Sequence, residues 1–312
     1  MVQTFPEPCE TSGLEIKEKD KLSPQLLQEW GQSGWIPAPG EKSVELVKRV
    51  DFLQRLKRDP YEVIDQTSGK LVSVDEWKPV IEKIEKQVGC KPLWLVSFYS
   101  NRKLMLWHGA VSWIYKDERG IRFPLIQLRK KFTSGNYFGY RREEVLFHEA
   151  LHALRAAYPE SCFEEILTYS ILRKRWRRLL GPLFRRPRHV GYLMLLLSFF
   201  GGVQLLSYWN LAIEQSIIAS LAPLAPSCYL GFLFWMLFRD QRIFKCALEK
   251  VKALFVRKED AFAVVFRLTD REIRYFAQKD IPDLHLYIRR QTSLRWQQIL
   301  LQFPVASDSK GQ

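Results

Sequence analysis

The sequence predicts an α+β fold joined to a transmembrane helical hairpin. Apolar and aromatic runs at 93–100, 104–115 and 121–131 are separated by short polar turns, which is typical of β-strands. Segments with helical periodicity and capping residues lie on both sides of these strands. Two later runs, 190–208 and 217–238, contain no charged residue, and each is long enough to cross a hydrocarbon core of about 30 Å.

Residues 1–90 are expected to be mainly helical. Ser23 and Pro24 have the pattern of a helix N-cap followed by the first helical residue. Ser43 is expected to cap a helix that ends near Arg58, and a further helix is expected over 74–87. The polar start of the chain has no apolar signal-peptide core, so we expect the hairpin itself to direct membrane insertion.

Residues 91–188 are expected to form the central domain, whose three strands pair as an antiparallel meander. Within it, 123–130 is the candidate for an open edge strand, because Pro124 cannot donate a hydrogen bond to a neighbouring strand. His108 is expected to lie inside the second strand and to pack there rather than to bind a substrate.

An HExxH motif, His148 to His152, follows these strands in an apolar helical run that is expected to span 141–157. Residues four apart lie on one face of a helix, so both imidazoles can reach a single tetrahedral zinc ion. Glu149 lies beside them, where it can act as a general base toward water. The pattern indicates metal-assisted hydrolysis, most often of a peptide bond.

A third zinc ligand is expected on the next helix. A turn at 158–160 separates the two helices, and an antiparallel arrangement around it places Glu165 opposite His152. Glu164 is expected instead to complete a capping box with Ser161, although a slip of one residue would exchange the two carboxylates.

The segment from Phe163 to Tyr169 resembles the second motif of the gluzincins, which are HExxH zinc peptidases whose third ligand is a Glu on a following helix. The resemblance covers 93–178 and implies a zincin-like domain in which an edge strand pairs with extended substrate. Tyr169 shares a helix face with Glu165, so it is expected either to assist catalysis or to pack between helices. A later segment, 257–263, faintly resembles membrane proteases of another type and makes Glu259 an alternate ligand.

These residues predict a zinc metallopeptidase that binds one zinc ion per chain and acts on a peptide or protein. His148, His152 and Glu165 would hold the zinc, and Glu149 would take a proton from the activated water and pass it to the leaving amine. The alternative is a non-catalytic zinc-binding membrane scaffold or regulator. The intact Glu149 favours the enzyme, because a structural zinc site needs no general base.

The hairpin is expected over 189–239, with a short loop at 209–216. Arginines and lysines flank it on both outer sides, and the loop contains none. By the positive-inside rule, the catalytic domain, both termini and the C-terminal region (240–312) are expected to be cytoplasmic. That region is expected to contain a basic amphipathic helix over 246–267 and another that begins at a capping box, Thr269 to Glu272.

The formal net charge is +14, to which the basic residues next to the hairpin contribute. Because this basic run adjoins a membrane span, we expect it to meet anionic lipid headgroups, and we expect no nucleic-acid partner. The five cysteines contain no CxxC pattern, and their odd number suits a reducing compartment rather than a disulfide framework.

Overall fold

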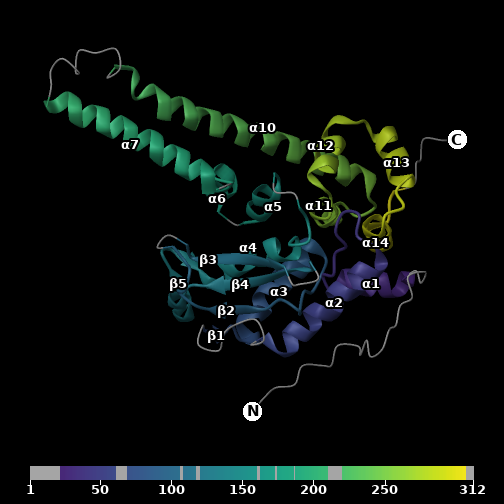
Figure 1. Cartoon of the computed structure of the whole chain (residues 1–312). Coiled ribbons are helices and arrows are strands. Elements are labelled where there is room, and N and C mark those ends of the chain that lie inside the picture. The colour runs from purple at the N-terminus through teal and green to yellow at the C-terminus, as the bar shows by residue number, and fades with distance from the viewer. Residues whose placement is uncertain are drawn as a thin grey trace. The chain divides into compact units, whose positions relative to one another are not determined.

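The fold is mixed α+β, mostly helical with a small sheet (Figure 1). The structure is a computed structural model, and it divides the chain into two compact units. The first unit comprises the described parts of 1–159, 251–269 and 280–312, and the second those of 160–250 and 270–279. The residues that the structure describes are 22–60, 69–105, 108–116, 120–159, 162–172, 174–185, 187–209 and 220–306.

The N-terminal helices of the first unit form where the capping residues predict them, with one shift. Helix α1 (Pro24–Gln32) begins after Ser23, whose hydroxyl accepts the amide hydrogen of Leu26. Helix α3 (Val74–Val88) begins with a capping box and ends at Gly89, whose φ of 72° suits a residue without a side chain. Helix α2 (Ser43–Arg58) includes Ser43 as its first residue, and Lys42 occupies the N-cap position instead of Ser43.

A four-stranded sheet contains β1 (Lys70–Leu71), β2 (Ser97–Tyr99), β3 (Ala110–Lys116) and β4 (Arg122–Leu128), in the order β1-β2-β4-β3. The predicted antiparallel meander is wrong, because β2 and β4 pair in parallel and only β3 and β4 form a hairpin. Strand β4 is buried from its second residue onward, whereas β3 is half-buried and then exposed. The more apolar strand therefore takes the centre of the sheet and β3 the edge.

The predicted edge strand, 123–130, is also wrong for this reason. Pro124 pairs with Ile114 of β3, while the pairing of β4 with β2 begins only at Ile126. On its other side, Pro124 has no strand partner in this sheet among the described residues. Its missing N–H is therefore tolerated, although β4 is a central strand from Ile126 onward.

The HExxH motif lies in helix α4 (Arg142–Leu154), which follows a short hairpin of β5 (Asn136–Tyr137) and β6 (Tyr140–Arg141). This helix packs against β3, β4 and α3. The predicted helix over 141–157 is longer than the observed one, because the chain forms a turn after Leu154. The apolar side chains that α4 buries are Leu146, Phe147, Ala150, Leu151, Ala153 and Leu154.

Most of the C-terminal region belongs to the first unit. The predicted helix over 246–267 is interrupted, since α10 ends at Leu254 and a single turn (η4, Lys258–Asp260) precedes α11 (Ala261–Phe266). Helices α13 (Ile281–Arg289) and α14 (Leu294–Gln302) follow.

Buried polar contacts join this region to the N-terminal helices. The amide of Gln298 donates to the carbonyls of Leu27 and Trp35, and the buried Arg267 donates to that of Val88. The sequence had left the packing of this region open, and these contacts assign it to the core of the first unit.

The second unit contains α5 (Glu164–Ser170), α6 (Arg175–Leu180), a short turn η3 (Gly181–Leu183), α7 (Pro187–Trp209), α10 (Leu224–Leu254) up to Lys250, and α12 (Asp270–Gln278). One helix among the described residues, spanning Arg188–Trp209, is long and apolar enough to cross a membrane. The first residues of the second predicted span, 217–238, lie outside the described set. Most of the predicted loop lies outside it as well. Its described part continues through Arg239 into a longer helix.

Candidate metal centre

Helix α4 presents His148, Glu149 and His152 on the side that its apolar residues leave free. These three side chains are only partly exposed, while Ala150 and Leu151 between them are buried. The hydroxyl of Ser112, in strand β3, donates a hydrogen bond of 2.9 Å to the carbonyl oxygen of Glu149. The motif is therefore attached directly to the edge strand of the sheet.

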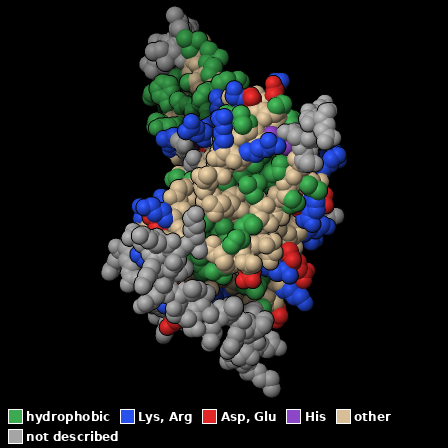
Figure 2. Space-filling view, turned by 90° about the vertical axis from the view of Figure 1, so that its right-hand side faces the viewer, with side chains coloured by type: hydrophobic (Ala, Val, Ile, Leu, Met, Phe, Trp, Pro, Cys, Tyr) green, Lys and Arg blue, Asp and Glu red, His purple; other side chains and the backbone are tan. Residues whose placement is uncertain are grey.

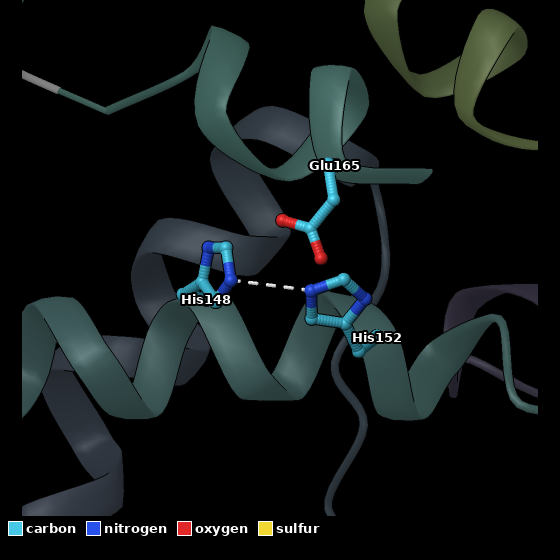
Figure 3. Close-up of side chains that lie close together, drawn as sticks. All are labelled: His148, His152 and Glu165. Atoms are coloured by element: carbon cyan, nitrogen blue, oxygen red, sulfur yellow. Dashed lines mark hydrogen bonds between the residues drawn. The ribbon is translucent and has the colours of Figure 1, made fainter. Parts of the chain in front are cut away.

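The two imidazoles have the spacing that one metal ion requires. Their Nε2 atoms lie 3.2 Å apart, and their rings meet edge to face at 76° (Figure 3). Zinc–nitrogen bonds of 2.0–2.1 Å in a tetrahedral site place two ligand nitrogens about 3.3 Å apart. His148 and His152 match this separation without rearrangement.

The carboxylate of Glu165, in the first turn of α5, points toward both imidazoles (Figure 3). One ligand atom from each of His148, His152 and Glu165 lies within 4.8 Å of the others, so the cluster can hold a metal ion. Glu164 is not part of any such cluster among the described residues. Glu259 is not either, and its side chain is 74% exposed beside Arg257.

Desolvation shapes the electrostatics of this centre. Burial, followed by the neighbouring His152, lowers the pKa of His148 well below its usual value, which favours the neutral imidazole that a metal requires. Burial raises the pKa of Glu149, although His152, Ser112 and His108 oppose that shift. A carboxylate with a raised pKa is a stronger base, which suits proton abstraction from water.

The start of helix α4 is held by a polar cluster in the first unit. Arg142, its first residue, pairs with Glu76 of α3, and the hydroxyl of Tyr99 in β2 donates to the same carboxylate at 2.9 Å. Burial and this bond to Glu76 raise the pKa of Tyr99 to about 12. Near the motif, the ammonium of Lys83 lies 3.9 Å from the ring centre of Phe147.

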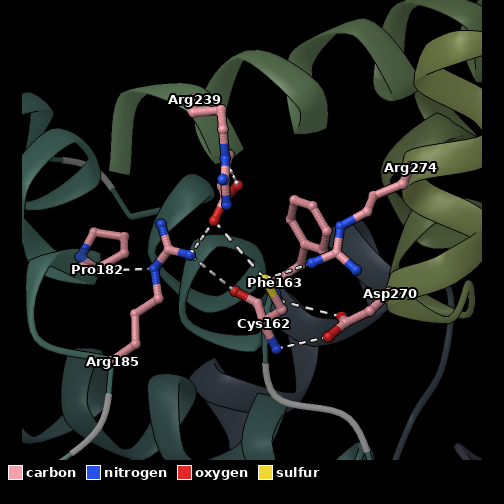
Figure 4. Close-up of polar contacts among 8 residues, drawn as sticks. Cys162, Phe163, Pro182, Arg185, Arg239, Asp270 and Arg274 are labelled. Carbon is pink, nitrogen blue, oxygen red and sulfur yellow. Dashed lines mark hydrogen bonds and ion pairs between the residues drawn. The ribbon is translucent and has the colours of Figure 1, made fainter. Parts of the chain in front are cut away.

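Helix α5 is held by a second polar cluster, which lies wholly within the second unit (Figure 4). Asp270, at the start of α12, accepts hydrogen bonds from the backbone amides of Cys162 (2.6 Å) and Phe163 (3.2 Å). Helix α5 has Phe163 at its N-cap position, without a side-chain cap from that residue. The expected capping box includes Ser161, which lies outside the described residues. Among the described residues, Asp270 supplies acceptors at the start of α5.

A buried ion pair completes this second cluster. Arg185 donates to Asp240 and to the carbonyl oxygen of Cys162, and Arg239 also donates to Asp240. Burial alone would raise the pKa of Asp240, but the bonds from the two arginines outweigh it and lower that pKa. The start of α5 is thereby connected to α10 and to the residues just before α7.

Two further residues had uncertain roles in the sequence. The ring of Tyr169 packs on Gly181, where an added Cβ would lie 2.2 Å from a ring carbon. His108 was expected inside a strand, which is wrong, since it lies just before β3 and its charge influences Glu149. Its carbonyl oxygen accepts a hydrogen bond from Arg129.

Sequence reasoning missed the contributions of Ser112, Arg185 and Asp270 to this site. Ser112 could have been noticed only once β3 was known to lie against α4. The sequence placed Asp270 in a capping box for its own helix. In the structure, its carboxylate accepts hydrogen bonds from the start of α5, a role that this motif alone does not predict. Comparison of the chain with protein-family models, with curated proteins and with solved structures found no match.

Proposed function

We propose that the protein is a membrane-attached zinc metallopeptidase that binds one zinc ion per chain. The observation that carries the proposal is the 3.2 Å separation of the His148 and His152 Nε2 atoms, with the Glu165 carboxylate beside them. Two imidazoles and one carboxylate are a donor set that zinc takes in hydrolytic enzymes, where a fourth position stays open. The zincin-like arrangement proposed here has β3 next to the HExxH helix.

The chain's own residues would divide the chemistry between binding and proton transfer. His148, His152 and Glu165 would hold the ion, which supplies Lewis-acid activation of water and of the scissile carbonyl when bound. Glu149 lies on the same helix but outside the ligand cluster. Its carboxylate would take a proton from the attacking water and pass it to the leaving amine nitrogen.

The open edge of β3 supports an extended peptide as the substrate. Strand β3 pairs with β4 on one side and is the terminal strand of the sheet in the part of the chain that the structure describes. Its backbone groups can pair with an added strand, and Ser112 connects it to Glu149. A peptide bound along β3 would thus run beside α4, close to the residues that carry out hydrolysis.

The proposed membrane attachment rests on α7 and α10. Only 6% of the apolar window of α7 is buried, whereas the core helix of a soluble protein is mostly buried. Large side chains of α7 are exposed, among them Leu195, Phe199 and Leu205. Tyr192 of α7 meets Tyr229 of α10 edge to face, and the two helices run in opposite directions (Figure 1). We therefore propose a two-span hairpin, with the basic flanks and both termini cytoplasmic.

Metal analysis of the full-length protein tests the enzymatic centre. The wild type should contain about one zinc per chain, and the double variant His148→Ala/His152→Ala should contain none. Stoichiometric zinc in the double variant would show that the ion binds elsewhere. Membrane attachment is tested separately, since alkaline carbonate should leave the full-length chain in the membrane pellet.

The competing function is a non-catalytic zinc-binding scaffold. Closed structural zinc sites usually have four protein ligands, often with cysteine. The cluster of described residues here has three ligands and no cysteine, and Glu149 is present beside it. A hydrolytic centre is therefore the better account of these residues.

A further inference from the structure

A basic surface surrounds the membrane-proximal ends of α7 and α10 in the second unit. We call it the headgroup surface and define it by its exposed cations. At the top of Figure 2, hydrophobic side chains gather over α7 and α10, with Lys and Arg side chains below them. The exposed cations of this surface are Lys174, Arg175, Arg178, Arg188, Arg239, Arg242 and Lys245.

The short helix α6 adds large apolar side chains to this surface. Trp176 is 58% exposed, and Leu179, Leu180 and the following Phe184 are each at least 40% exposed. Side chains of this size are rarely left in water by a short helix whose neighbours could cover them. Together with arginines in the same turns, they form the amphipathic pattern of a segment that lies in a membrane interface.

Internal bonds hold α6 in this position. The side-chain amide of Gln241 in α10 donates to the carbonyl oxygen of Leu179 at 2.8 Å. Beyond α6, Arg185 pairs with the buried Asp240, so the C-terminal end of α6 and the residues that follow it are both attached to α10. The exposed side chains of α6 are therefore presented by a supported helix at the base of α7 and α10.

The charge of the headgroup surface is almost uncompensated. Between Ile166 and Arg239 the sequence contains a single acidic residue, Glu214. Asp240, which follows, is fully buried and already binds Arg185 and Arg239. Two of the exposed tryptophans carry an arginine over the ring, Arg177 over Trp176 and Arg239 over Trp235. Such pairs suit the boundary between apolar and charged surroundings.

We propose that the headgroup surface binds anionic phospholipid headgroups, with α6 lying in the membrane interface. The inference rests on the proposed membrane attachment and adds the lipid class and the residues that recognise it. Anionic lipid is favoured over nucleic acid because the surface continues into the exposed apolar side chains of α7, which a polynucleotide would leave uncovered. Basic side chains near an anionic membrane each contribute about fivefold in affinity.

The test measures which lipids stay with the full-length protein. The protein is reconstituted into vesicles of phosphatidylcholine with a minor fraction of phosphatidylglycerol, dissolved in non-ionic detergent and gel-filtered, and the bound headgroups are quantified. The wild type should enrich phosphatidylglycerol about tenfold over the input ratio. The triple variant Arg175→Gln/Arg178→Gln/Arg242→Gln should return to the input ratio.

A matched control separates this surface from net charge. The variant Lys48→Gln/Lys86→Gln/Lys130→Gln removes the same charge from exposed residues of the first unit and should keep the enrichment. A second variant, Trp176→Ser/Leu179→Ser, keeps the charge and should reduce the total bound phospholipid. Circular dichroism of each variant confirms that its helices remain.

The outcomes distinguish this inference from the proposed function. Equal enrichment in the wild type and the arginine variant, or an equal loss in the lysine control, would overturn the headgroup surface. The headgroup surface would also be overturned if nucleic acid co-purified with the wild type and was absent from the arginine variant. If carbonate extracts the wild-type chain, membrane attachment itself fails, whereas zinc retained by the His148→Ala/His152→Ala variant would overturn the metal centre alone.

Discussion

The hydroxyl of Ser112 donates a hydrogen bond of 2.9 Å to the carbonyl oxygen of Glu149, which joins the edge strand β3 to the HExxH helix. The bond sets how far β3 can move along α4. In the proposed function, a peptide paired with β3 would therefore meet Glu149 in a defined register.

Replacement of Ser112 by Ala should cost about 0.5–1.5 kcal/mol of unfolding free energy, the usual net contribution of such a bond. Zinc content should not change, because Ser112 is not a ligand. Chemical denaturation followed by tryptophan fluorescence measures the first quantity, and elemental analysis the second. Unchanged stability would mean that water replaces the hydroxyl, and Ser134→Ala in the first unit is a control for loss of a surface hydroxyl.

Replacement of Glu165 by Gln should strongly lower the zinc content of the purified protein, because a carboxylate ligand is lost. Glu164→Gln and Glu259→Gln should retain zinc, since neither residue belongs to the cluster. Titration with a competing chelator compares the three variants directly. Loss of zinc in Glu164→Gln alone would exchange the roles of the two neighbouring carboxylates, and loss in Glu259→Gln alone would move the third ligand to η4.

Glu149→Gln should keep its zinc and lower peptide hydrolysis by about 10²–10⁴-fold, the usual contribution of a general base. Initial rates on a peptide that the wild type cleaves give the comparison, with zinc measured on the same preparations. Glu144→Gln, five residues earlier in α4, is the matched control and should retain activity. Equal turnover by the wild type and Glu149→Gln would refute the proposed proton transfer.

Asp270→Ala should weaken the start of α5, because the amides of Cys162 and Phe163 lose their acceptor. Loss of a helix cap costs about 0.5–2 kcal/mol. Since α5 carries Glu165, the affinity for zinc should fall as well, although no ligand is removed. Asp283→Ala, near the start of α13 in the first unit, should leave that affinity unchanged. Similar zinc affinity in the two variants would show that the bonds from Asp270 do not influence zinc binding.

Stability should decrease at high pH through Tyr99. The unfolded phenol has a pKa near 10, whereas burial and the bond to Glu76 raise the pKa to about 12 in the folded protein. The folded state therefore holds its proton more tightly, so the stabilisation is complete below about pH 10 and is lost as the pH rises toward 12. Denaturation curves should lose this pH dependence in Tyr99→Phe, which should also cost about 1 kcal/mol at neutral pH.

Local sequence patterns predicted the elements that depend on neighbouring residues. Helix α3 was expected over 74–87 and is observed from Val74 to Val88. The four-residue spacing placed both imidazoles of the HExxH motif on one helix face, where their nitrogens lie 3.2 Å apart. The short connection after α4 limited how far Glu165 could lie from them, and the three residues do form one cluster.

Other elements could not be predicted because their placement depends on competition between distant segments. Three apolar strands in a row fit a meander, yet β2 pairs in parallel with β4, because these two strands are the buried ones and β3 is half-buried or exposed. Pro124 indicated an edge strand, although among the described residues only the part of β4 that contains it lacks a second partner. The composition of one strand does not predict at which residue its pairing with a neighbouring strand begins.

The sequence by itself determined the HExxH helix, the cap of α1 at Ser23 and the apolar helix α7, because each follows from the periodicity or chemistry of residues close together in the chain. Only the tertiary structure decided that Asp270 caps α5, that Ser112 holds Glu149 and that Gln298 joins the C-terminal region to α1. These contacts join residues far apart in sequence, and their partners are selected by burial and unsatisfied backbone groups that exist only once the chain has folded.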